Sequence, residues 1–98
     1  MLRITIFEKD GSTRFRLEGK LTGLWVKELE RCWILAKHVG HGRRLIVDLD
    51  SVSFVDDKGK ALLESMVEEH AELEATDPLM ASVAATIVEH SSAAHAHR

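Results

Sequence analysis

Hydrophobic and polar residues alternate in two short segments at the start of the chain. Leu2 to Phe7 and Thr13 to Gly19 both follow this pattern, which is typical of strands with one covered face. Asp10 and Gly11 lie between them and form a strong hairpin signal. We therefore predict that the chain opens with an antiparallel pair of strands.

The following segment changes to a helical period. Thr22 is a suitable residue to cap the start of this helix, and Gly40 or Gly42 is suited to end it. Leu45 to Leu49 comes next and is apolar except for Asp48, which predicts a central strand covered on both faces or nearly so. The apolar residues that recur at steps of three and four in the helix are Trp25, Leu29, Cys32, Trp33 and Ala36.

The second half of the chain continues to alternate between helix and strand. A second helix is predicted after Asp56, and Ala71 to Thr76 predicts a short strand. Asp77 is a good cap and Pro78 suits the first helical position, so we predict a third helix from Pro78 to Glu89. The order of strand, strand, helix, strand, helix, strand and helix predicts an α/β fold whose first strand is antiparallel at the edge of a mixed sheet.

Length and composition limit the classes of protein that fit. The 98 residues suit one domain, which we place at residues 1–89, with 90–98 as a flexible tail. A net charge of -3 gives no general attraction to nucleic acid. Because there is one cysteine, Cys32, and no apolar run near the roughly 20 residues that cross a bilayer, we expect a soluble, cytoplasmic domain.

The segment from Leu45 to Leu63, "LIVDLDSVSFVDDKGKALL", resembles the central motif of the STAS domain family, whose founding members are bacterial anti-sigma factor antagonists. Leu17 to Thr22 is similar to the turn that precedes the first helix of that family. The resemblance implies a mixed sheet of about four strands with helices mainly over one face. The residues at matching motif positions are Asp48, Leu49, Phe54, Val55, Asp56 and Gly59.

In switching members of the family, a kinase that is also the anti-sigma factor phosphorylates the serine just before the glycine, and the added charge separates the partners. Lys58 stands at that position here, and Asp57 replaces the neighbouring hydroxyl. The resemblance therefore implies a domain without the usual phosphoserine switch.

The same resemblance implies that the start of the second helix forms a docking surface for a protein partner such as an anti-sigma factor of the kinase type. Asp56 and Asp57 complement the positive end of the helix, whereas Lys58 and Lys60 oppose it. The lysines indicate either a task outside the fold or two acids and two lysines that neutralise one another on a solvated surface. The residues expected at this surface are Asp56, Asp57, Lys58, Gly59 and Lys60, with Ser51 and Ser53 in an adjoining loop.

Two other functions use the same residues. A small anion or nucleotide would bind at the helix start with help from Lys58 and Lys60, and an accessory subunit of a membrane transport complex is a further alternative. We expect no catalysis, because no nucleophile has an evident base partner, and we expect no cofactor or metal. The histidines His90, His95 and His97 are interpreted as exposed residues rather than metal ligands.

The predicted third helix carries no charge between Pro78 and Val88. Its apolar residues spread over more than the narrow stripe that one sheet face would cover. We therefore expect part of this helix to meet a partner or a second copy of the chain.

Overall fold

The computed structural model describes residues 1–40 and 42–96, with side chains up to residue 91. Its elements follow the predicted order, and their type and sequence confirm the predicted α/β class. The elements are β1 (Leu2–Lys9), β2 (Ser12–Leu21), α1 (Leu24–Val39), β3 (Arg44–Val55), α2 (Asp57–Glu68), β4 (Glu72–Glu74) and α3 (Pro78–Ala96).

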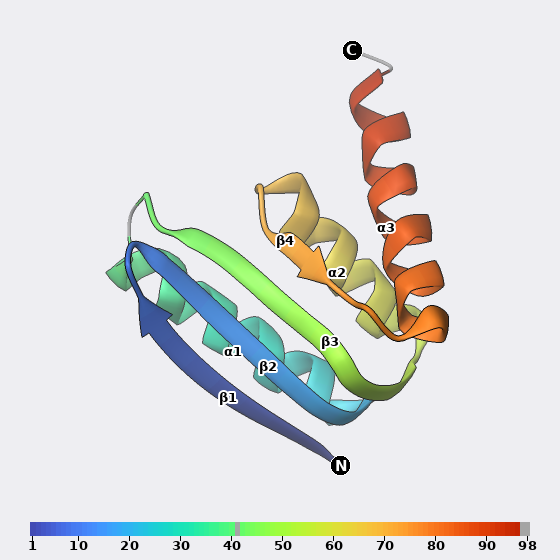
Figure 1. Cartoon of the computed structure of the whole chain (residues 1–98), viewed down its shortest axis with the longest axis horizontal. Coiled ribbons are helices and arrows are strands. Elements are labelled where there is room, and N and C mark those ends of the chain that lie inside the picture. The colour runs from blue at the N-terminus through green and yellow to red at the C-terminus, as the bar shows by residue number, and fades with distance from the viewer. Residues whose placement is uncertain (41, 97–98) are drawn as a thin grey trace.

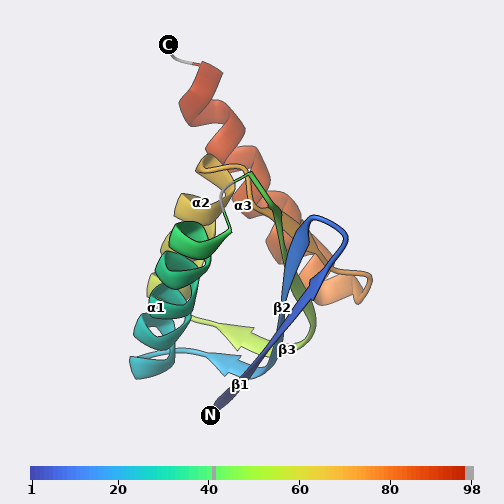
Figure 2. The same ribbon diagram turned by 90° about the vertical axis from the view of Figure 1, so that its left-hand side faces the viewer.

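The strands form one mixed sheet of four strands in the order β1-β2-β3-β4. β1 is antiparallel to β2, whereas β2, β3 and β4 are parallel. β1 lies at one edge, as predicted, and the β1–β2 hairpin turns at Asp10 and Gly11, which both have positive φ. Helices α1 and α2 cover one face of the sheet, and α3 stands beside β4 and packs against α2 (Figures 1 and 2).

The hydrophobic core lies between the sheet and helices α1 and α2, and Met80, Ala84 and Ile87 of α3 belong to the same cluster. Alternate residues of β2 and β3 point into it, which is the arrangement expected of strands with one helix-covered face. The largest fully buried side chains are Phe15, Leu17, Leu21, Leu29, Val47, Leu49, Leu63 and Met66.

Strand β3 extends well beyond the predicted Leu45 to Leu49. Its pairing with β2 shifts twice, between Arg16 and Glu18 and again between Gly19 and Lys20. Each shift leaves an extra residue on β3, as in a β-bulge, so the strict alternation of side chains is lost. The sequence pattern beyond Leu49 therefore did not read as strand, although Val52 and Val55 are buried.

The second face of β3 also differs from the expectation of a strand covered on both sides. Neither α1 nor α2 lies over this face (Figure 2). Ile46 is nevertheless 6% exposed, and it sits between Arg14 of β2 and Glu72 of β4 in the strand register. Long charged side chains therefore cover this part of the sheet in place of a helix.

The ends of two helices differ from their predicted positions. Thr22 does not cap α1, because the N-cap is Gly23 and makes no side-chain capping bond, whereas the end at Gly40 is as predicted. Helix α3 continues past Glu89 to Ala96 and buries Ser91, so most of the segment predicted as a flexible tail belongs to this helix. Residues 97 and 98 of that predicted tail lie outside the described residues. Over the described residues, no helix is both long and apolar enough to cross a membrane.

Candidate functional site

The side chain of Asp56 connects the starts of two helices. Asp56 is the N-cap of α2, and its Oδ1 accepts a hydrogen bond of 2.7 Å from the Gly59 amide. Its Oδ2 accepts a second bond of 3.0 Å from the amide of Gly23, the N-cap of α1. One carboxylate thus satisfies a backbone donor at the start of each helix.

The parallel strands β2 and β3 bring these helix starts together. The two strands end side by side, with Leu21 opposite Val55, and the Asp56 amide donates to the Leu21 carbonyl at 3.2 Å. Each strand then turns directly into the helix that follows it. Asp56 caps α2 as predicted, and its second hydrogen bond reaches α1, which lacks a capping side chain of its own.

Hydrogen bonding lowers the pKa of Asp56 below its ordinary value. The largest cause is the Gly59 amide, followed by the Gly23 amide, and burial opposes them. The positive charge and the amide of Lys58 lower the pKa further. The carboxylate is therefore ionised at neutral pH, as a double acceptor must be.

Gly59 is required because α2 approaches the end of β2 closely. A Cβ atom at this position would lie 2.8 Å from the Leu21 carbonyl oxygen and 2.8 Å from Val55 Cγ1. Both distances are shorter than ordinary carbon contacts, and one of the neighbours is backbone that does not move freely. The glycine thus fixes how tightly the first turn of α2 rests on the sheet.

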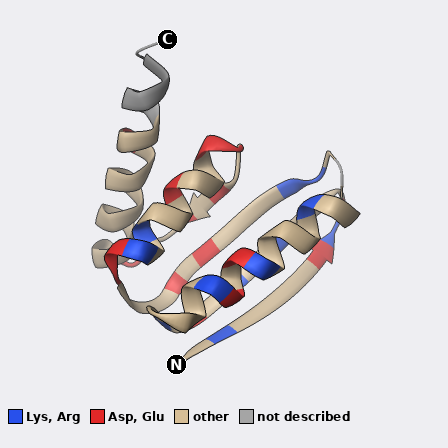
Figure 3. Cartoon of the chain, turned by 180° about the vertical axis from the view of Figure 1, so that it is seen from behind, with Lys and Arg blue, Asp and Glu red and all other residues tan. Residues whose placement is uncertain are grey.

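The other predicted residues of the helix start face solvent. Asp57, Lys58 and Lys60 are all exposed, and Figure 3 shows acidic and basic residues next to one another at the start of α2. Lys58 also borders an open groove of about 480 Å³ between α1 and α2, where Trp33 and Leu62 contribute to the lining. The structure thus places Asp57, Lys58 and Lys60 on one exposed turn, whereas Gly59, also predicted at this surface, is buried beneath it.

Ser51 and Ser53 were predicted in a loop, and this was wrong, because both belong to β3. Ser53 lies at the second register shift, and its hydroxyl donates to the Gly19 carbonyl at 3.3 Å. Ser51 is also exposed, and it lies at the first register shift. Both side chains therefore precede the helix start on the same strand instead of forming a flexible loop beside it.

Two exposed apolar side chains near this turn were not identified from the sequence. Leu24, the first residue of α1, is 79% exposed, and Phe54, near the end of β3, is 53% exposed. Leu24 does not fall on the apolar stripe of α1, and this position was the sequence signal for its exposure. Phe54 follows a bulge, so no alternation in the sequence showed which way it faces.

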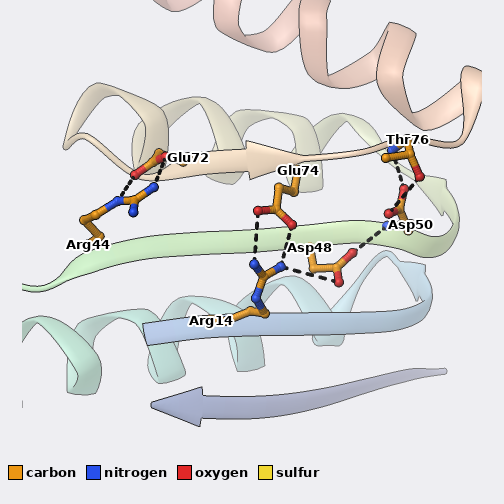
Figure 4. A network of polar contacts seen from close by, with 7 residues as sticks. All are labelled: Arg14, Arg44, Asp48, Asp50, Glu72, Glu74 and Thr76. Carbon is orange, nitrogen blue, oxygen red and sulfur yellow. Dashed lines mark hydrogen bonds and ion pairs between the residues drawn. The ribbon is translucent and has the colours of Figure 1, made fainter. Parts of the chain in front are cut away.

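The helix-free face of the sheet carries a network of ion pairs (Figure 4). Arg14 forms a bidentate pair with Glu74 and lies 3.8 Å from Asp48, and Arg44 binds both carboxylate oxygens of Glu72 at 2.8 and 2.9 Å. The pKa of Glu72 is lowered, chiefly by its hydrogen bond to Arg44. The charged residues alternate along three strands, and this alternation is present in the sequence, but a single sequence does not show which strands are neighbours.

Asp50 closes this network at the start of α3. Its carboxylate accepts hydrogen bonds from the Thr76 amide and hydroxyl and from the Asp77 amide at 3.1 Å (Figure 4). These backbone bonds lower the pKa of Asp50, those from Thr76 and Asp77 being the largest causes. The network therefore links β4 and the turn into α3 to the central strand β3. These links account for the positions of β4 and of the turn.

The three C-terminal histidines are only partly described. His90 is exposed, and its Nδ1 lies 3.4 Å from Glu64 Oε2 of the neighbouring helix. The side chain of His95 and all of His97 lie outside the described residues. The interpretation as a surface residue is confirmed for His90, and for His95 and His97 it stays a prediction.

Comparisons with known proteins identify the fold. No protein-family model matches the sequence, and no curated protein sequence matches it. An uncharacterized protein of the DUF3478 family from Shewanella loihica PV-4, described as having a SpoIIAA-like fold, aligns with a TM-score of 0.53 and 13% identity over 81% of this chain and 70% of its own. The fold of this chain is SpoIIAA-like.

Two crystal structures of Mglu, one of them in its native form, also resemble the SpoIIAA-like fold of this chain. They align with TM-scores of 0.56 and 0.57, at 19% and 16% identity, over 76% and 74% of this chain. The chain spans only about a fifth of Mglu, because the matched parts are 19% and 22% of those chains. At this level of identity the likeness concerns the fold alone.

Proposed function

We propose that this domain binds a regulatory protein through the start of α2 and performs no catalysis. The observation that carries this proposal is the double hydrogen bond of Asp56 to Gly59 and Gly23, which fixes the exposed turn in one conformation. A rigid surface loses little conformational entropy on binding, which favours recognition by contact. We call this surface the junction surface, and it consists of Leu24, Phe54, Asp57, Lys58 and Lys60.

The chemical character of the junction surface suits a protein partner. Leu24 and Phe54 offer exposed apolar area, and aromatic side chains are frequent among the residues that dominate binding energy. Asp57, Lys58 and Lys60 add charges of both signs, which favours a partner with matching charges of opposite sign. Surfaces that combine apolar anchors with such a polar rim are typical of protein recognition.

Anion or nucleotide binding at the same helix start is less well supported. Free backbone amides at a helix start are what attracts a phosphate group. The Gly59 amide already donates to Asp56, whose negative charge occupies the place that an anion would take. Lys58 and Lys60 alone are two exposed surface cations, which do not make a defined anion site.

The resemblance to the STAS family suggests the kind of partner. In that family the helix start meets an anti-sigma factor of the kinase type, and phosphorylation of a serine ends the interaction. With Lys58 at the phosphoacceptor position, the interaction proposed here is constitutive and depends on the abundance of the partner.

Titration calorimetry with an anti-sigma factor of the kinase type tests this proposal. Phe54→Ala and Lys58→Glu are expected to weaken binding at least about tenfold, which corresponds to about 1.4 kcal/mol. Lys9→Glu is the matched control, because it makes the same charge change near the β1–β2 hairpin, at the opposite end of β3. A complex that forms equally well with all three variants would contradict the proposed surface.

A parallel titration with ATP separates the anion alternative from protein docking. Saturable binding of ATP that disappears in the Lys58→Ala, Lys60→Ala double variant would support the anion site and overturn the docking proposal. Absence of ATP binding, together with a partner complex sensitive to Phe54→Ala, is the result expected here.

A further inference from the structure

The two edges of the sheet are protected to very different degrees. β4 has three residues, of which Glu72 and Glu74 are exposed and charged, and α3 stands beside it. β1 has eight residues and pairs with β2 along its whole length without a register shift. Within the described chain, β1 pairs only with β2, so a long and regular edge faces solvent.

The middle of β1 lacks the features that usually prevent edge pairing. Natural edge strands carry central charges, prolines or bulges that block the approach of another strand. Ile4 to Phe7 contains neither charge nor proline, and Ile6 and Phe7 are each 46% exposed. Ile6 lies opposite Phe15 on the helix-covered face and Phe7 opposite Arg14 on the other, so apolar surface is exposed on both faces of this edge.

The hydrogen-bond pattern shows which backbone groups of β1 point outward. The Lys20 amide donates to the Met1 carbonyl at 3.0 Å, so Met1 faces β2. In an antiparallel pair the residues face the neighbouring strand alternately. Leu2, Ile4, Ile6 and Glu8 therefore present their amide and carbonyl groups to the open side of the strand.

We infer that the β1 edges of two copies of this chain pair antiparallel about a two-fold axis at Thr5, which joins the two sheets into one. In this register Ile4 lies opposite Ile6 of the second copy, so the exposed apolar side chains cover each other. Leu2 also lies opposite Glu8 of the second copy, so all four outward-facing residues form hydrogen-bonded pairs. On the other face Arg3 lies opposite Phe7, a pairing that suits a cation–π contact.

The neighbouring symmetric registers are less favourable. Placing the two-fold axis at Ile6 brings Arg3 opposite Lys9 of the second copy, and like charges directly opposite are destabilising. Placing it at Ile4 leaves the outward groups of Glu8 unpaired. Shifting the register of the two β1 strands by one residue would place side chains from opposite faces of the sheets next to each other. Two antiparallel strands related by a two-fold axis do not allow this pairing.

Sedimentation velocity on the full chain tests whether this pairing forms. The wild type is expected to sediment as a dimer and Ile6→Pro as a monomer with an unchanged far-UV circular dichroism spectrum. The proline removes an outward-facing amide that β2 does not use, and proline is tolerated at such edge positions. Ile6→Val is the matched control and is expected to stay dimeric.

Cysteine cross-linking tests the register without depending on the proline variant. In a Cys32→Ser background, Thr5→Cys is expected to form a disulfide-linked dimer on mild oxidation, because Cα atoms of a facing non-hydrogen-bonded pair lie about 4.5 Å apart, within disulfide range. Ile4→Cys and Ile6→Cys are the matched controls for the two shifted registers, and they are expected to cross-link at least about fivefold more slowly.

Three results would overturn the inference. The first is a wild-type monomer at its highest soluble concentration. The second is faster cross-linking through Ile4→Cys or Ile6→Cys than through Thr5→Cys. The third is a dimer that persists in Ile6→Pro but is lost in Val88→Glu. Val88 is 41% exposed on α3, so this result would place the dimer contact on that helix. None of these results depends on the junction surface, so they leave the proposed function untouched.

Discussion

The carboxylate of Asp56 accepts a hydrogen bond from the amide of Gly23, a residue 33 positions earlier in the chain. Gly23 begins α1, and the same carboxylate also caps α2 through the Gly59 amide. A capping interaction normally stabilises one helix. Here it holds the starts of two helices at the end of two parallel strands, where the junction surface lies.

Replacement of Asp56 by alanine is therefore expected to destabilise the domain more than a normal capping substitution. The variant leaves both the Gly59 and the Gly23 amides without their acceptor. Asp57→Ala is the matched control, because Asp57 is the adjacent acid but is exposed. Urea unfolding should give a lower midpoint for Asp56→Ala than for Asp57→Ala. Equal midpoints would show that the two hydrogen bonds of the Asp56 carboxylate contribute nothing to stability.

The lowered pKa of Asp56 predicts a dependence of stability on acid. Its pKa is lower in the folded than in the unfolded chain, so the unfolded chain binds the proton more readily. The free energy of unfolding should therefore be highest above the ordinary pKa of an aspartate, about 3.9, and fall as the pH drops through the lower native pKa.

Urea titrations from pH 7 to about pH 3 measure this dependence. Asp56→Asn should show a shallower loss of stability with acid than the wild type, since its amide does not titrate. Asp50 and Glu72 also have lowered pKa values, so some acid dependence should remain in that variant. An identical slope in both proteins would assign the acid dependence to those other carboxylates alone.

Gly59→Ala should destabilise the domain by about 1–3 kcal/mol, the usual cost of adding atoms to a well-packed site. The new methyl group would meet the Leu21 carbonyl and Val55 Cγ1 at 2.8 Å. The same substitution in an unobstructed helix stabilises it by up to about 1 kcal/mol. Denaturant unfolding thus distinguishes the two cases by the sign of the change, and a stabilised variant would contradict the close approach.

Lys58→Ser should restore a phosphoacceptor at the start of α2. Incubation with an anti-sigma factor of the kinase type and labelled ATP is expected to leave the wild type unlabelled and to label the variant. The variant carries a hydroxyl at the position that the resemblance assigns to the family's phosphoserine, and the residue is exposed. Labelling of the wild type between Asp56 and Lys60 would show that a switch exists here after all.

Local patterns were sufficient to predict the elements of this fold. Alternation predicted β1 and β2, helical spacing predicted α1 and α2, and Asp77 with Pro78 predicted the start of α3. These signals depend on residues a few positions apart, whose side chains share a face of one element. The role of Asp56 as the cap of α2 was predictable for the same reason.

Relationships between distant segments were settled only by the tertiary structure. The second partner of Asp56, the bulges that keep Ser51 and Ser53 in β3, and the ion pairs over Ile46 all join residues from different elements. A single sequence does not record which strands lie side by side or in what register. It determined the elements and their order, because backbone preference and side-chain period are local. Packing then decided which surfaces remained open, because burial depends on the neighbours that folding brings together.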